Sequence, residues 1–173
     1  MAGLLIAVQA HGADLCTLPK LTEVAADHPQ CLFYSGTEKY RAGDYAGAKS
    51  FWQKLVSVKD ISPEFAELKT SAYNNLGFLH YMGWGAAMDR PLAIDYWKHA
   101  AIMGHEEATY HLCHVYGQRD NPEFDLDYGL EYCKEALKRY AKHKDLDESR
   151  EEVIDQIKTI LRAISPAPLP MRR

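Results

Sequence analysis

Ser71–Gly104 reads SAYNNLGFLHYMGWGAAMDRPLAIDYWKHAAIMG, and Glu107–Tyr140 repeats its pattern at an offset of 36 residues without a gap. The identical pairs are Ala72/Ala108, Leu76/Leu112, Asp89/Asp125, Tyr96/Tyr132, Lys98/Lys134 and Ala100/Ala136. The same offset aligns Gly77 with Cys113, Ala93 with Gly129 and Trp97 with Cys133. Self-similarity at a fixed period is the signature of a repeat protein. The two stretches therefore predict two copies of one structural unit.

Each copy predicts a pair of helices. In the first copy, apolar residues at helical spacing end at Gly83, which favours a helix stop there. The second helix is expected to begin after Asp89, a good N-cap, with Pro91 in its first turn, and to end at Gly104. Small residues such as Gly77 allow two antiparallel helices to approach closely where they cross.

A divergent third copy and a final helix extend this array. Cys31–Leu55 carries Gly36 in the place of Gly77, with about five extra residues expected around 60–63. Downstream, Ser149–Glu152 has the form of a capping box that opens an amphipathic helix. The sequence therefore predicts an all-α fold: an α-α solenoid of three helical-hairpin repeats closed by a C-terminal capping helix.

These residues resemble a known family. Asn75–Gly85 (NLGFLHYMGWG) and the spacing that follows it are similar to a Sel1-like repeat, and the upstream copy resembles the related tetratricopeptide repeat. The downstream positions are Asp89, Ala93, Trp97, Ala100, Ala101 and Gly104. The resemblance covers about residues 31–140 and departs from the family at His80, where Tyr is usual, and at Cys113, which replaces Gly. It implies a protein that acts as an adaptor or assembly factor.

By pattern the chain divides into four segments. Residues 1–13 resemble the back half of a secretory signal, with an apolar run followed by small residues. Residues 14–30 form an N-terminal segment tied to the array, with a short helix expected at 18–26. Residues 31–164 are the repeat domain with its capping helix, and the Pro-rich residues 165–173 are a tail.

Export to the bacterial periplasm follows as an expectation from residues 1–13. The alternatives are a truncated start or the ordinary apolar N-terminus of a cytoplasmic protein. The apolar run is shorter than the ~20 residues that span a bilayer, so no membrane span is expected. The net charge is −4 without a concentrated basic stripe, which argues against a nucleic-acid partner.

The four cysteines predict two disulfides. Three pairings are possible, and the repeat register favours Cys113 with Cys133, since both occupy the facing sides of one predicted hairpin. Cys16 would then pair with Cys31. One alternative is buried free thiols in a cytosolic protein. Another is a metal site formed by His111, Cys113, His114 and Cys133, but no pair has the spacing typical of zinc ligands, so we expect no metal and no cofactor.

No nucleophile–base or phosphate-binding motif is present, so we do not expect an enzyme. The first helix of each pair should line the concave side of the array, the usual binding surface of solenoids. The outward positions there are Phe33, Thr37, Tyr40, Asn74, Phe78, Tyr81, Tyr110 and His114.

This aromatic-rich set is expected to contact a protein partner. We expect a periplasmic interaction module, in its sharper form an immunity protein that inhibits a secreted toxin such as a type VI secretion lipase effector. A structural adaptor for envelope or flagellar-motor assembly is the alternative.

Overall fold

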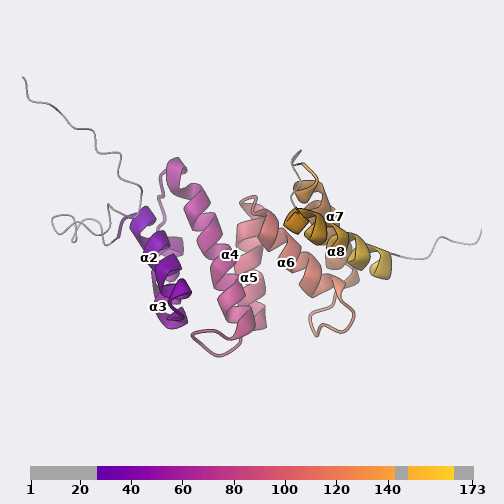
Figure 1. Cartoon of the computed structure of the whole chain (residues 1–173), viewed down its shortest axis with the longest axis horizontal. Coiled ribbons are helices and arrows are strands. Elements are labelled where there is room, and N and C mark those ends of the chain that lie inside the picture. The colour runs from indigo at the N-terminus through magenta and orange to yellow at the C-terminus, as the bar shows by residue number, and fades with distance from the viewer. Residues whose placement is uncertain (1–26, 143–147, 166–173) are drawn as a thin grey trace, which may run out of the picture. The chain divides into compact units, whose positions relative to one another are not determined.

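The structure is a computed structural model that describes residues 27–142 and 148–165. Its elements are α2 (Pro29–Arg41), α3 (Tyr45–Ser57), the 3-10 turn η2 (Pro63–Phe65), α4 (Ala66–Met82), α5 (Arg90–Ile102), α6 (Glu106–Gly117), α7 (Leu126–Tyr140) and α8 (Glu148–Ile164). Figure 1 labels the α-helices. No strand occurs in these two ranges. The predicted all-α class is confirmed, and α7 begins 36 residues after α5, as the repeat offset requires.

The chain forms two compact units that divide between Asp89 and Arg90, inside the range predicted as one repeat domain. In the first unit α2 and α3 form a hairpin, and α3 packs against α4. In the second, α5 packs on α6 and α6 on α7, and α8 contacts both α6 and α7. Successive helices therefore pack in chain order within each unit. Residues 1–13, the helix expected at 18–26 and tail residues 166–173 lie outside the described part.

Helix ends follow the residues that predicted them. Gly83 ends α4 in the left-handed conformation (φ +69°), and its N–H donates to the carbonyl of Leu79. The Asp125 carboxylate accepts a hydrogen bond of 3.0 Å from the N–H of Tyr128 and so caps α7. One expectation was wrong: Ser149 lies inside the first turn of α8, after Glu148, and is not its N-cap.

The crossing of α2 and α3 shows why a small residue is needed there. A Cβ added to Gly36 would lie 2.5 Å from Nε1 of Trp52, a buried side chain at 2% exposure. The Trp52 indole N–H donates to the carbonyl of Phe33 at 3.2 Å, which fixes the ring across the α2 backbone. Glycine thus allows the indole to lie directly on the neighbouring helix.

Helix α8 is part of the core of the second unit. It buries one apolar face in a cluster that also contains Cys113, Cys133, Ala136 and Tyr140. The α8 residues of this cluster are Ile154, Ile157, Ile160 and Ile164. Near the start of α8, the Arg150 guanidinium donates to both carboxylate oxygens of Glu106 on α6, at 2.6 and 3.2 Å. In the described ranges, no helix combines the length and apolar character needed to cross a bilayer.

Candidate functional site

Six of the predicted contact residues lie in the first unit, on α2 and α4. The Thr37 hydroxyl is used locally, since it donates to the carbonyl of Phe33 at 3.0 Å. Asn74 is only 4% exposed, so its side chain is core and its inclusion in the contact surface was wrong. Phe33 and Tyr81 remain half-buried on their helices. The predicted contact residues on α2 and α4 therefore expose less surface to a partner than their helical spacing in the sequence indicated.

Tyr40 and Phe78 pack on Trp84, a residue of the loop after α4. The Trp84 ring stacks on Tyr45 (centroids 4.8 Å apart, planes at 25°), meets Phe78 edge-on at 5.4 Å and lies 6.3 Å from Tyr40. These contacts join α2, α3, α4 and the loop in one cluster. The two predicted contact residues therefore stabilise the fold of the first unit, as aromatic pairs do in cores.

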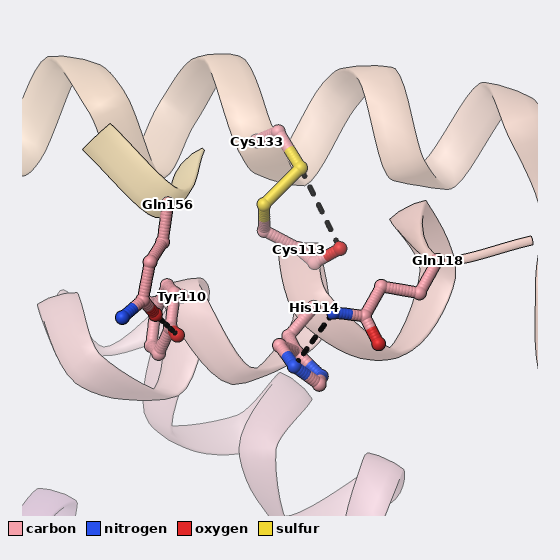
Figure 2. Close-up of a disulfide and its surroundings, with 6 residues drawn as sticks. All are labelled: Tyr110, Cys113, His114, Gln118, Cys133 and Gln156. Carbon is pink, nitrogen blue, oxygen red and sulfur yellow. Dashed lines mark hydrogen bonds between the residues drawn. A yellow bond between two sulfur atoms is a disulfide. The ribbon is translucent and has the colours of Figure 1, made fainter. Parts of the chain in front are cut away.

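Tyr110 and His114 lie one turn apart on α6 of the second unit. The Tyr110 hydroxyl donates a short hydrogen bond to Oε1 of Gln156 on α8 (Figure 2). Burial raises the pKa of Tyr110 above its usual value, so the phenol stays a donor at neutral pH. Helix α8, expected only as an end cap, therefore lies beside the predicted binding face of α6.

A cleft of about 480 Å³ lies between α6 and α8. Its lining residues are His114, Gln118, Glu152, Asp155, Gln156, Thr159 and Ile160. Nε2 of Gln118 lies 2.8 Å from Nε2 of His114 (Figure 2), and burial lowers the pKa of His114 although Asp120 opposes this. The neutral imidazole can therefore accept a hydrogen bond from the Gln118 amide.

The cleft is open to solvent and rich in amides and carboxylates, whereas small-molecule sites usually enclose their ligand in an apolar pocket. The α8 residues of the cleft were missed by sequence analysis. The available signal was the polar face of the amphipathic α8, which periodicity alone assigns to solvent.

A disulfide joins Cys113 of α6 to Cys133 of α7, the pair that the repeat register favours (Figure 2). Their Cα atoms are 4.5 Å apart and both side chains are fully buried. The 3.5 Å approach of Cys133 Sγ to the Cys113 carbonyl is a contact only, because a disulfide sulfur carries no proton. Cys31 is also disulfide-bonded. Its predicted partner Cys16 lies outside the described residues, so that pairing stays a prediction.

The disulfide corrects the metal alternative. Cys113 and Cys133 offer no thiolate, so two of the four suggested ligands are lost. His111 is used elsewhere, since its ring stacks on Trp97 with centroids 4.7 Å apart. Within the described ranges, no group of three or more His, Cys, Asp or Glu side chains is placed to hold a metal ion.

His111 predicts a pH-dependent stability. Burial, aided by the charges of His114 and His105, lowers its pKa from 6.5 to about 4. The unfolded chain then binds this proton more readily than the folded one, so stability present above pH 6.5 is lost as the pH falls toward 4. We expect the urea midpoint to drop less between pH 7 and pH 5 in His111→Phe than in the wild type. The control His99→Gln changes an exposed histidine of α5 and should keep the wild-type slope; equal slopes in all three proteins would contradict the assignment.

Comparisons with known proteins find a likeness among solved structures. No family model matches the chain, and no curated protein matches it. Among solved structures, the chain is similar to the crystal structure of a Sel1 repeat protein from Oxalobacter formigenes. The identity is 18%, the match covers 84% of this chain and 78% of that chain, and the TM-score is 0.37.

Proposed function

We propose that this chain is a non-catalytic protein–protein interaction module that binds a partner through the cleft between α6 and α8. The observation that carries this proposal is the open cleft of about 480 Å³, with amides and carboxylates in its lining, beside the predicted contact residues Tyr110 and His114. Ile160 of its lining belongs to the same buried cluster as the Cys113–Cys133 disulfide, so this side of the cleft is anchored in a cross-linked core. An anchored cleft with hydrogen-bonding side chains favours recognition of a partner surface, because little order must be gained on binding.

The compartment proposed is the bacterial periplasm. The described cysteines are all disulfide-bonded, and such bonds persist in oxidising compartments. The signal-like pattern of residues 1–13 supports the same assignment.

In its sharper form the module is an immunity protein that neutralises a toxin delivered to the periplasm, such as a lipase effector. The resemblance of residues 75–104 to Sel1-like repeats supports this, because such proteins bind other proteins and some are inhibitors. Fold-level analogy alone carries this part of the proposal.

Two adjacent glutamates on α8 provide a matched test. Both Glu151 and Glu152 are exposed in the first part of the helix, but only Glu152 lines the cleft. We expect Glu152→Arg to weaken partner binding by about tenfold or more, because it places a long cation at the cleft. Glu151→Arg makes the same charge change outside the cleft and should bind like the wild type.

The first step is a search of the neighbouring genes for a periplasm-directed hydrolase. The readout is protection of cells against that hydrolase, followed by calorimetry on the purified pair. Protection by the wild type and by Glu151→Arg, but not by Glu152→Arg, would support the immunity role. Binding of the hydrolase without protection of the cells would contradict the immunity role and favour the adaptor alternative. Equal binding by both variants would rule out the cleft as the contact site.

A further inference from the structure

The second unit carries a lysine held by tyrosine rings of α6 and α7, and none of these residues lines the α6–α8 cleft. Nζ of Lys98 lies 5.6 Å from the ring centroid of Tyr116 and 5.4 Å from that of Tyr128. Tyr132 stacks on Tyr116, with centroids 5.8 Å apart and planes at 12°. We refer to these four residues as the Lys98 cluster. Because they come from α5, α6 and α7, three packed helices fix the position of the ammonium.

Lys98 has no carboxylate within ion-pair distance in the part of the chain that the structure describes. Burial lowers its pKa, but the hydrogen bond and charges of the tyrosines outweigh this and raise the pKa above its usual value. The group therefore stays cationic at neutral pH. A half-buried cation without a counter-ion gains more from an incoming carboxylate than a fully hydrated one does.

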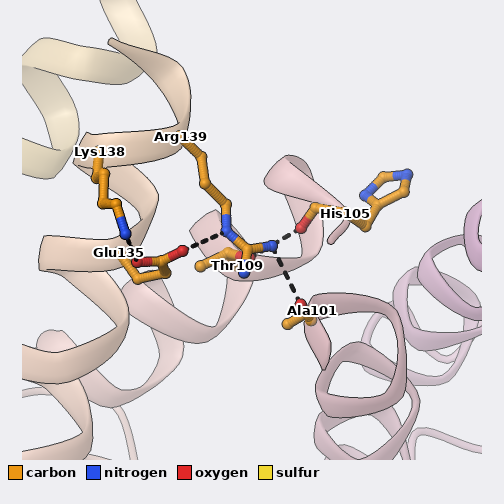
Figure 3. A network of polar contacts seen from close by, with 6 residues as sticks. All are labelled: Ala101, His105, Thr109, Glu135, Lys138 and Arg139. Atoms are coloured by element: carbon orange, nitrogen blue, oxygen red, sulfur yellow. Dashed lines mark hydrogen bonds and ion pairs between the residues drawn. The ribbon is translucent and has the colours of Figure 1, made fainter. Parts of the chain in front are cut away.

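A groove of about 210 Å³ runs between α5 and α7 beside this cluster. Its lining residues are Lys98, Ala101, Ile102, Thr109, Glu131, Tyr132, Glu135 and Arg139. Arg139 donates to the Glu135 carboxylate at 2.8 Å and to the Ala101 carbonyl at 3.1 Å (Figure 3). The Arg139 guanidinium is therefore already paired within the chain. Lys98 is the cation of this lining that has no acidic partner among the described residues.

The rim of the groove carries an unusually exposed apolar side chain. Ile102 is 84% exposed at the end of α5, one turn beyond Lys98. On α7, Tyr128 is 46% exposed and presents one ring of the Lys98 cluster to solvent. Aromatic and aliphatic side chains beside a fixed charge form the kind of surface on which interface energy concentrates.

We propose that the α5–α7 groove is a second docking surface, which binds an acidic-aliphatic segment of a protein partner. The segment places an Asp or Glu carboxylate on the Lys98 ammonium and an adjacent aliphatic side chain on Ile102. Charge complementarity at the Lys98 ammonium selects this occupant. Glu135 and Arg139 are paired within the chain, and Glu131, the remaining carboxylate of the lining, is not within ion-pair distance of Lys98. The inference rests on the proposed role in protein binding but uses a different face.

The test is a selection of random 12-residue peptides displayed on phage against the full, oxidised chain. We expect enriched peptides to share an acidic residue next to an aliphatic one. Their binding should fall about tenfold or more in Lys98→Met and be retained in Lys98→Arg, which keeps the charge. Ile102→Asp should also weaken binding, and at 84% exposure this substitution leaves the core intact.

Lys134→Met is the matched control. Lys134 is the repeat equivalent of Lys98, yet it is exposed on α7 and outside the groove, so its loss should leave peptide binding unchanged. Failure to enrich any peptide whose affinity depends on Lys98 overturns the proposal, as does a basic consensus. Glu152→Arg distinguishes the two surfaces. Lys98-dependent peptide binding that survives this substitution is assigned to the α5–α7 groove. A variant that keeps peptide binding but no longer binds the toxin proposed as partner has lost only the α6–α8 cleft.

Discussion

Replacing both Cys113 and Cys133 by Ala is expected to lower the free energy of unfolding by about 3 kcal/mol. The bond joins residues 20 apart in sequence and removes conformations from the unfolded chain. Both sulfurs are also fully buried in the core of the second unit. Alanine introduces no polar group there, so the loss reports the cross-link and a small cavity rather than a buried unsatisfied atom.

Urea unfolding followed by circular dichroism measures this difference. The double variant should lose a large fraction of the stability typical of a small domain, which is on the order of 5–15 kcal/mol. Adding a reductant to the wild type should reproduce most of the loss. In the double variant the reductant can act only on the bond of Cys31, so any further change is assigned to that bond. A midpoint shared by oxidised wild type and double variant would show that the disulfide contributes no stability.

This disulfide could be predicted because it depends on repeat register alone. Gly77 and Cys113 occupy equivalent buried places on α4 and α6, and Trp97 and Cys133 do so on α5 and α7. Apolar periodicity and glycine positions determine which helix faces meet, since both reflect the core directly.

The binding surface could not be predicted in the same way. Periodicity shows that Tyr40, Phe78 and Tyr110 point away from their own hairpins, but not which distant segment covers them. Trp84 folds back on the first two, and Gln156 of α8 binds the third. Such contacts depend on tertiary packing between segments far apart in sequence, and the periodicity of a helical repeat does not determine which segments meet. For the same reason the Lys98 cluster, assembled from three helices, has no signal in any single stretch of sequence.

Gly85→Ala is expected to destabilise the first unit by about 3 kcal/mol, from two additive causes. Gly85 has φ +73°, which costs an L-residue with a Cβ about 1–2 kcal/mol. The added Cβ would also lie 2.6 Å from the backbone of Tyr45 and Ala46 at the start of α3. Backbone cannot rotate away as a side chain can, so the loop that carries Trp84 must move. That movement would also loosen the stacking of Trp84 on Tyr45.

Gly43→Ala separates the two causes. Gly43 has nearly the same conformation, φ +78°, but an added Cβ would meet nothing within 4 Å. We expect this control to cost only about 1 kcal/mol, the conformational part alone. Urea unfolding followed by tryptophan fluorescence measures both variants, and Trp84 emission should also shift in folded Gly85→Ala. If the two substitutions cost the same, the contact of Gly85 with α3 does not hold the loop, and the stability of the aromatic cluster must come from its rings alone.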